Sequence, residues 1–476
     1  MTMLQFGDVD PLPTPRRPLQ GGEGEFQATA LVEEARDHLY WLFGSRAALI
    51  LVAAALLFTT MAGWASEQPG GTKKKPTAVN QRTWQLSEFV ILLGWPFLVF
   101  CPDDAAVIKA AAEADFNVIM WDVGKLPLCH RYGLKLMVDH ASGFGIGWDG
   151  PDPDPQDEWD WRAGEYFRKI GPLRPEMASA LSEDPAIWGY WIIDEPRSEQ
   201  FPEMAAYLRA FEQADSGHPA YINLLWPGGE YLENFLQVVK PQVLSYDYYQ
   251  WWWGREGHFP RLEEHRRAAL AEGIPLLCWV EVNANPEAAA ATYGQEDTVA
   301  HLPDNAVKLR QSVYTSLAYG VEGIEWFTAG YMFDFGTSKL NACGRDVAAL
   351  NAELKRLGPV LVRLRSTDVF HTPPLPAETR ALPADYWVQT ETPELVLGVF
   401  KDRYDDAADY LLVANKGIQE KREVVLQFRR PVALVEQLDK QSGKWRALPL
   451  TTGGESQLVK LTLAPGDGEL LRVVGP

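Results

Sequence analysis

Short apolar segments alternate with helix-like segments eight times along residues 89–357. Each apolar segment has the length of a strand buried on both faces, as the strands of a parallel sheet are. The expected strands are, in chain order, Phe89–Leu93, Asn117–Asp122, Leu134–His140, Trp188–Glu195, Ala220–Pro227, Gln242–Tyr249, Ile274–Glu281 and Gly323–Thr328. Eight strand–helix units within about 270 residues have the size of a closed (β/α)8 barrel, the TIM barrel. A doubly wound open sheet is the alternative, but it usually has fewer strands and a Gly-rich first turn, which this sequence lacks.

The segments between these strands have helical spacing. The clearest are Asp103–Ala114, Glu199–Gln213, Tyr231–Val239, Arg261–Glu272 and Asn305–Tyr319, and Val347–Leu357 would be the closing helix. Asp103 or Asp104 is expected to cap the first of them, because an aspartate side chain accepts hydrogen bonds from free N–H groups at a helix start. The barrel is therefore predicted to span residues 88–365.

Beyond about residue 366 the pattern changes to short strands without intervening helices. The expected strands are Asp385–Thr390, Leu395–Phe400, Tyr410–Asn415, Arg422–Phe428, Val432–Glu436 and Val459–Leu463. Such a series predicts an antiparallel β-sandwich over residues 366–476.

The N-terminal region precedes the barrel and has a different composition. Residues 1–45 are polar and rich in Pro and Gly, which predicts a disordered extension. Residues 46–65 join a basic flank to an apolar run that ends in small residues, which is typical of a secretory signal cleaved near Ala65. An uncleaved membrane anchor is the alternative, because the run is long enough to span a bilayer. With residues 66–87 as a linker, we expect a secreted or periplasmic protein, or a membrane-anchored one.

Composition narrows the class of ligand. The net charge of −20 argues against nucleic-acid binding, which needs clustered Lys and Arg. The 18 Trp, 17 Tyr and 20 Phe offer flat apolar faces that could stack on sugar rings, although core packing also uses such rings. Neither Cys101, Cys129, Cys278 and Cys343 nor the scattered His residues have metal-ligand spacing, so no metal or other cofactor is expected. The four Cys could form one or two disulfides or remain buried thiols.

Polar and aromatic residues gather where the predicted strands end. The fourth strand ends in Asp194-Glu195-Pro196, and Pro196 has no N–H with which to continue it. Chemistry in barrels of this kind takes place at the C-terminal ends of the strands. The residues expected there are Trp95, Asp122, Asp139, His140, Asp194, Glu195, Asn223, Trp226, Asp247, Tyr248, Glu281, Glu325 and Trp326. The run Trp251–Trp253 follows the sixth strand and either contacts substrate or packs its loop.

Carboxylates and aromatic rings together suit a carbohydrate. Cleavage of a glycosidic bond needs one carboxylic acid to protonate the leaving oxygen and a second carboxylate as nucleophile or base. Glu195 and Glu281 end strands four and seven, which lie across the barrel. They could approach to roughly 5–5.5 Å, the separation found in retaining enzymes.

Five segments together resemble a known superfamily: Asp194–Pro196, Tyr221–Leu224, Val239–Tyr248, Gly273–Pro275 and Val313–Ile324. They are similar to the (β/α)8 glycoside hydrolases whose catalytic carboxylates lie on strands four and seven. More narrowly, they resemble a group of exported bacterial barrel proteins with a strand-four Asp-Glu-Pro motif. The resemblance implies that Glu195 is the general acid/base and Glu281 the nucleophile. Asp194 stands where the superfamily usually has Asn, and the narrower group often has Gln in place of Glu281, which keeps Glu325 and Asp247 open as alternative nucleophiles.

We therefore expect a retaining glycoside hydrolase that acts on a polysaccharide or oligosaccharide, with Asp122, His140, Asp194, Asn223, Trp226, Asp247, Tyr248, Glu325 and Trp326 as substrate-binding residues. A barrel protein that binds carbohydrate without cleaving it is the alternative. A polysaccharide lyase would need a basic cleft for a uronate, and the acidic composition argues against it.

Overall fold

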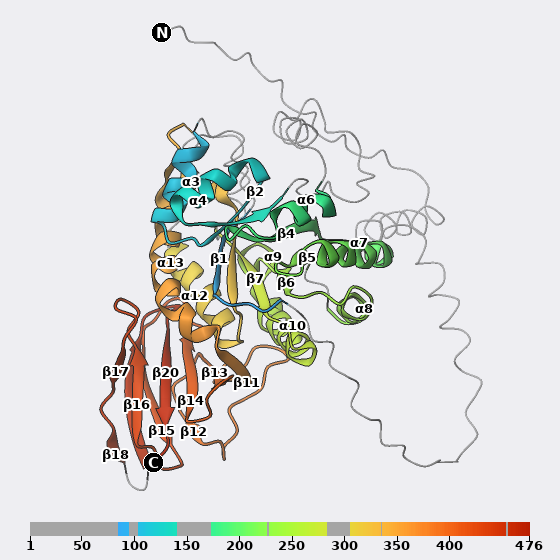
Figure 1. The fold of residues 1–476 in the computed structure, drawn as a ribbon. Coiled ribbons are helices and arrows are strands. Elements are labelled where there is room, and N and C mark those ends of the chain that lie inside the picture. Colours follow the sequence, from blue (N-terminus) through green and yellow to red (C-terminus); the bar gives the residue numbers. More distant parts are fainter. Residues whose placement is uncertain are drawn as a thin grey trace, which may run out of the picture. The chain divides into compact units, whose positions relative to one another are not determined.

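Eight parallel strands close into a barrel (Figure 1). The structure is a computed structural model that describes residues 84–94, 103–139, 173–225, 228–282, 305–334, 336–453 and 456–476. The barrel strands are β1 (Val90–Leu93), β2 (Val118–Trp121), β3 (Lys135–Val138), β4 (Ile187–Asp194), β5 (Ala220–Leu225), β6 (Leu244–Asp247), β7 (Leu276–Glu281) and β8 (Gly323–Phe327). Each pairs in parallel with the next, and β8 pairs with β1. The prediction of a TIM barrel is confirmed.

A helix follows every barrel strand. The helices are α3 (Asp104–Glu113), α4 (Leu126–Tyr132), α6 (Pro175–Leu181), α7 (Phe201–Ala214), α8 (Glu230–Val238), α10 (His258–Glu272), α12 (Asn305–Ala318) and α13 (Ala342–Leu361). The side chain of Asp103 accepts a hydrogen bond from the N–H of Ala106 and caps α3, as the sequence predicts. Short elements join them: α9 (Gln250–Trp253), the 3-10 turns η2 (Val123–Lys125), η3 (Ser198–Gln200), η4 (Arg255–Gly257) and η5 (Ala329–Tyr331), and the hairpin β9 (Phe333–Asp334) and β10 (Lys339–Leu340).

The barrel strands are buried on both faces. On β7, Leu277 and Trp279 pack inside the barrel, whereas Cys278 and Val280 pack outward against the helices. This alternation follows from the two-residue period of a strand. It decides which residues near a strand end can face the barrel axis.

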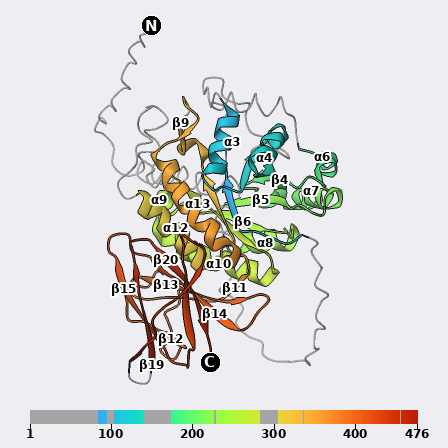
Figure 2. The ribbon, with the colours of Figure 1, turned by 60° about the vertical axis from the view of Figure 1, so that its left-hand side comes forward.

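The C-terminal strands form two antiparallel sheets, a β-sandwich. One sheet has the order β11 (Leu364–His371), β13 (Leu395–Asp402), β14 (Ala408–Asn415), β20 (Gly468–Val474), β16 (Leu434–Leu438) and β17 (Trp445–Ala447). The other has the order β12 (Val388–Gln389), β15 (Arg422–Phe428), β19 (Ser456–Leu463) and β18 (Thr451–Gly453). The predicted sandwich is confirmed, although the sequence analysis did not foresee β11, β17, β18 and β20. The larger sheet adjoins the barrel, where β13 and β14 contact α12 (Figures 1 and 2).

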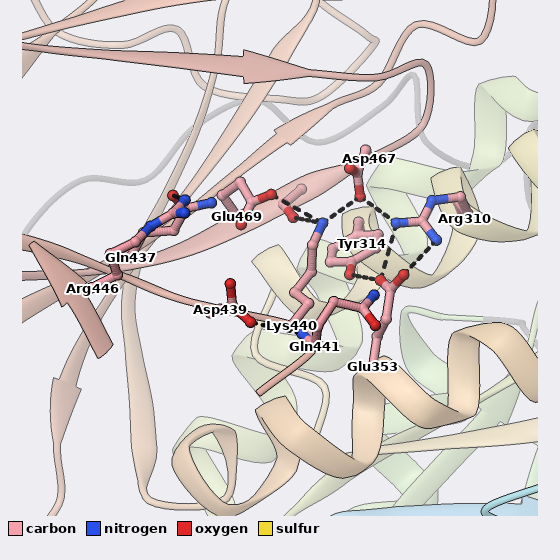
Figure 3. A network of polar contacts seen from close by, with 11 residues as sticks. Arg310, Tyr314, Glu353, Gln437, Asp439, Lys440, Gln441, Arg446, Asp467 and Glu469 are labelled. Atoms are coloured by element: carbon pink, nitrogen blue, oxygen red, sulfur yellow. Dashed lines mark hydrogen bonds and ion pairs between the residues drawn. The ribbon is translucent and has the colours of Figure 1, made fainter. Parts of the chain in front are cut away.

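A network of ion pairs joins the sandwich to the barrel helices (Figure 3). Arg310 of α12 forms two hydrogen bonds with Glu353 of α13, of 2.9 and 3.0 Å, and a third of 2.6 Å with Asp467. Lys440 pairs with Asp467 at 2.8 Å and with Glu469 at 3.1 Å. Such bidentate and charge-assisted contacts fix geometry as well as supplying energy.

The predicted extension, signal or anchor lie outside the described residues, as does nearly all of the linker. Within the described part of the chain, no helix has the length and apolarity needed to cross a bilayer. In the same part, Cys129, Cys278 and Cys343 are buried free thiols, and no cluster of His, Cys, Asp and Glu has an arrangement suited to a metal ion.

Candidate active site

The C-terminal ends of four neighbouring barrel strands carry polar side chains. We call this rim the mouth; its residues are Asp194 of β4, Asn223 of β5, Asp247 of β6 and Glu281 of β7, with Glu195 directly after β4. Strand register places Asp194 opposite Asn223. Glu281 shares the inward parity of Leu277 and Trp279, so its side chain belongs to the barrel interior.

The backbone of Glu195 has an unusual conformation. Its φ is 42°, in the left-handed region that non-glycine residues seldom adopt. Neighbouring hydrogen bonds hold it: the N–H of Glu195 donates to the carbonyl of Asn223 at 3.0 Å, and the hydroxyl of Tyr231 donates to the carbonyl of Pro196 at 2.6 Å. Strain of roughly 1–3 kcal/mol at one residue persists only where the surroundings enforce it, and such positions cluster at functional sites.

Asp247 and Glu195 form a hydrogen-bonded pair of carboxyl groups. Burial raises the pKa of Asp247 well above its usual value, and the charges of Glu195 and Asp194 raise it further. Burial also raises the pKa of Glu195, whereas the hydrogen bond from Asp247 lowers it. Asp247 is 4% exposed, whereas Glu195 is exposed to solvent. Both pKa values are raised, that of Asp247 by more, so the pair favours keeping a proton beside the solvent-exposed Glu195.

Asp194 is hydrogen-bonded to Asn223. The amide nitrogen of Asn223 donates to Oδ1 of Asp194 at 3.0 Å. Loss of water around the carboxyl group, followed by the charge of Glu195, raises the pKa of Asp194 to about 8, although the bond from Asn223 opposes the shift. Asp194 is therefore mostly protonated at pH 7.

Glu281 is buried, with 1% of its surface exposed. Its Oε1 accepts a hydrogen bond of 2.7 Å from the backbone N–H of Trp251. Burial raises the pKa of Glu281 to about 8, and the Trp251 N–H counteracts this only in part. This carboxyl group is thus held in a fixed position and is mostly neutral at pH 7.

A helical turn, α9, supplies that N–H. The side-chain amide of Gln250 donates to Oε1 of Gln311 at 2.9 Å and to Oγ of Ser312 at 2.7 Å. The indole N–H of Trp251 donates to the same Ser312 oxygen at 3.0 Å. Helix α12 therefore anchors α9 and, through it, Glu281. The sequence left open whether Trp251–Trp253 contact substrate or pack the loop; the indole of Trp251 is engaged with α12.

The other rings near the mouth form an aromatic cluster. Tyr249 stacks on Phe327 with ring centroids 5.0 Å apart, and Trp252 meets Phe327 edge-on at 5.8 Å. Trp253 lies against Tyr249 at 4.9 Å and is 42% exposed. Trp253 is thus the ring of this cluster that presents a face to solvent.

Two predicted site residues on β8 lie away from the mouth. Glu325 lies in the barrel interior, bonded to Tyr221 and Ser245. Trp326 is fully buried and faces outward, where its indole N–H donates to Asn351 of α13 at 2.8 Å; the expectation that it lines the mouth is wrong, because β8 turns odd-numbered residues inward.

Two further predicted residues each support a local turn. Asp122 accepts a 2.8 Å bond from the N–H of Gly124 and caps η2. The hydroxyl of Tyr248 donates to the carbonyl of Gly254 at 2.7 Å and holds the turn after α9. Asp139 is buried at the end of β3, where its charge adds to the raised pKa of Asp194. Trp95, His140 and Trp226 lie outside the described residues.

Sequence reasoning missed the polar residues one layer below the mouth. These are Tyr221, Ser245 and Trp279, each two residues before a mouth residue on its own strand. Because side chains two apart on a strand share a face, counting back from Asn223, Asp247 and Glu281 was the available signal.

No known family model matches the sequence, and no curated protein matches it either. Among solved structures, the chain is similar to a glycoside hydrolase family 5 mannosidase from Rhizomucor miehei, with 12% identity, a TM-score of 0.39, and coverage of 57% of this chain and 94% of that one. It is also similar to a family 27 β-L-arabinopyranosidase from Geobacillus stearothermophilus, with 9% identity, a TM-score of 0.44, and coverage of 83% and 97%. A family 29 α-L-fucosidase from Bacteroides thetaiotaomicron gives 10% identity, a TM-score of 0.42, and coverage of 85% and 96%.

Proposed function

We propose that this protein is a glycoside hydrolase that cleaves O-glycosidic bonds in a polysaccharide or oligosaccharide by a retaining mechanism. The observation that carries the proposal is the pairing of the buried Asp247 with the solvent-exposed Glu195, in which burial raises the pKa of both carboxyl groups. Raised pKa values of this kind suit a group that must protonate a leaving oxygen. Glu281, three strands from β4 around the barrel, supplies a second carboxyl group.

In this proposal Glu195 is the general acid/base and Glu281 is the nucleophile. Asp247 and Glu195 touch each other, whereas the acid and the nucleophile of a retaining enzyme must stand about 5–5.5 Å apart, with the sugar between them. Asp247 is therefore the proton-holding partner of Glu195. Glu195 passes a proton from the Asp247–Glu195 pair to the departing oxygen as the ionised form of Glu281 attacks the sugar carbon. The pair then regains a proton from the water that releases the sugar, and Glu281 leaves as a carboxylate.

Two other groups at the mouth would bind the sugar. A protonated Asp194 has an O–H that can donate to a substrate hydroxyl, as the amide of an asparagine would. The exposed ring of Trp253 offers a flat apolar face on which a sugar ring can stack.

Hydrolysis by the purified protein of a panel of aryl glycosides and polysaccharides, between about pH 5 and pH 9, tests the proposal. Glu195→Gln and Glu281→Gln should each lower kcat by about 10³-fold or more. Glu322→Gln is the matched control, because Glu322 is also buried but precedes β8, at the opposite end of the barrel from the mouth.

Activity should rise with pH as Glu281 ionises around its pKa of about 8. Azide should restore turnover to Glu281→Ala, because it can replace the missing carboxylate as nucleophile. If azide fails to restore turnover and Glu195→Gln is inactive, the nucleophile is a residue other than Glu281.

A carbohydrate-binding protein without hydrolytic activity is the second candidate. One observation favours it: burial keeps Glu281 mostly neutral at pH 7, and a neutral carboxyl group is a poor nucleophile. If a glycan binds but no member of the panel is cleaved at any pH, this second function replaces the first.

Export is part of the proposal. Residues 46–65 would direct the chain out of the cytoplasm, either as a cleaved signal or as an anchor. Sequencing the N-terminus of the protein recovered from culture medium, periplasm and membrane would separate the two, because cleavage leaves a new N-terminus near Ser66. Recovery of the intact chain in the cytoplasm alone would contradict export.

A further inference from the structure

A cluster of polar side chains lies inside the barrel, one layer below the mouth. Glu325, Tyr221 and Ser245 are each fully buried, on β8, β5 and β6. The hydroxyl of Tyr221 lies 2.7 Å from Oε1 of Glu325, and Oγ of Ser245 lies 2.6 Å from its Oε2. Tyr221 and Ser245 are themselves 2.5 Å apart, and the indole N–H of Trp279 donates to the Tyr221 oxygen at 3.0 Å. We call Glu325, Tyr221 and Ser245 the interior triad.

The interior triad is connected to the mouth. Oγ of Ser245 lies 3.1 Å from Oδ1 of Asn223, and the amide nitrogen of the same Asn223 donates to Asp194 at 3.0 Å. A continuous series of hydrogen bonds therefore runs from Glu325 to Asp194, the residue next to Glu195.

Counting the protons in this series favours an uncharged Glu325. The nitrogen of the Asn223 amide faces Asp194, so the amide oxygen faces Ser245. An amide oxygen can only accept a hydrogen bond, and Ser245 must therefore donate its single hydroxyl proton to Asn223. The 2.6 Å contact between Ser245 and Glu325 then needs a proton from Glu325. Tyr221 and Ser245 have one hydroxyl proton each, but they make four contacts with one another, with Glu325 and with Asn223. An ionised Glu325 therefore leaves two of the four contacts without a proton, whereas a protonated Glu325 leaves only one.

We infer that Glu325 is a positioning residue that acts as an uncharged carboxylic acid and donates its proton to Ser245. Ser245 in turn donates to Asn223, whose amide holds Asp194 in place beside Glu195. The role of this series in catalysis rests on the proposed function, whereas the charge of Glu325 and the orientation of Asn223 do not.

The surroundings of Glu325 support its neutral form. Burial raises the pKa of Glu325 to about 8, against the opposing effect of the bonds from Ser245 and Tyr221. The titratable groups that interact electrostatically with it are Tyr221 on β5, Asp194 on β4 and, from the outer face of β7, Cys278, and none of these is a cation. A carboxylate here would therefore face other acidic groups without a compensating charge.

Infrared spectroscopy of the full chain at neutral pH tests the charge of Glu325. Wild type should show a protonated-carboxyl stretch that Glu325→Gln lacks, and the exposed Glu230→Gln should leave that region of the spectrum unchanged. The new amide in Glu325→Gln would donate to Ser245 and accept from Tyr221, so this variant should fold with an unchanged Asn223–Asp194 contact. If Glu325→Gln and wild type have the same spectrum in the region of the protonated-carboxyl stretch, Glu325 is ionised and the inference is wrong.

Crystal structures of two variants test the positioning. Ser245→Ala should release the Asn223 amide from Asp194, whereas Glu325→Gln should keep it. An Asn223–Asp194 contact that survives in Ser245→Ala would overturn the positioning role. On a cleaved aryl glycoside, Ser245→Ala should lower kcat about tenfold or more with little change in KM, and Glu325→Gln should stay within about threefold of wild type. If no substrate is found, the spectra and structures still decide the inference, while the proposed function alone fails.

Discussion

A protonated carboxyl group has the donor and the acceptor that a side-chain amide has, and Asp194 meets this description at neutral pH. Asp194→Asn should therefore keep activity at pH 7 within about threefold of wild type, because the substitution retains the contact with Asn223 and a donor toward the mouth. At alkaline pH the variant should outperform wild type, since wild-type Asp194 loses its proton above about 8.

The pH profiles of kcat for the two proteins check this prediction, with Glu322→Gln again as the control for changing a buried carboxyl group to an amide. A loss of 100-fold or more at pH 7, on the order of 3 kcal/mol, would mean that Asp194 works as a charged group.

Residue patterns in the sequence locate much of the candidate site but not its side-chain orientations. Asp194, Glu195, Asp247 and Glu281 lie where the apolar run of a strand ends, whereas Asn223 lies within β5 and is followed by Leu224 and Leu225. The opposite orientations of Glu325 and Trp326 were out of reach, because a strand buried on both faces has no alternation of polar and apolar residues to set its parity.

Among the elements, α9 is the one whose position depends most on side chains far away in the sequence. Its Gln250 is buried and donates to two groups on α12. Gln250→Leu would leave Gln311 and Ser312 without this donor and should destabilise the protein by about 2 kcal/mol.

Because α9 carries the N–H that binds Glu281, the same change should lower kcat about tenfold or more. Urea unfolding and kinetics check the two effects, and Gln441→Leu, an exposed position in the sandwich, is the matched control. A normal kcat in a destabilised Gln250→Leu would show that the anchor of α9 supports stability alone.

The sandwich strands show where element prediction stops. β17 and β18 have three residues each, too few to establish a period. β20 contains Glu469, a charged residue that is only 8% exposed because Lys440 pairs with it. A tertiary ion pair thus permits a charge within a buried strand, and local sequence does not reveal it.

At the scale of the whole molecule, the network around Arg310 and Lys440 joins the sandwich to α12 and α13 (Figure 3). The Lys440 side chain is 12% exposed, contacts Asp467 and Glu469, and lies over the ring of Tyr314 at 4.9 Å. Lys440→Met would leave these carboxylates under-compensated in a mostly buried place and should lower the free energy of unfolding by about 3 kcal/mol.

Lys109→Met provides the comparison, because Lys109 is 57% exposed and its partner Glu113 is 66% exposed. Exposed pairs of this kind contribute about 0.5 kcal/mol or less. Urea unfolding of both variants measures the difference, and equal effects would mean that the network contributes no more than a surface ion pair.

The buried carboxyl groups should also make the stability of the whole protein fall as pH rises. The pKa values of Asp194, Glu281 and Glu325 are each raised by burial to about 8 in the folded protein. Between the ordinary carboxyl pKa near 4 and this raised value, the folded state binds more protons than the unfolded state, so the free energy of unfolding must decrease with pH. The contribution is fully present below about pH 4 and is lost as pH rises through about 8.

Melting temperatures measured from about pH 5 to pH 9 should therefore fall toward the alkaline end, and less steeply in Glu325→Gln, which has no proton to lose at that position. Parallel curves for Glu325→Gln and wild type would place the pKa of Glu325 near its unfolded value and contradict its burial as a neutral acid.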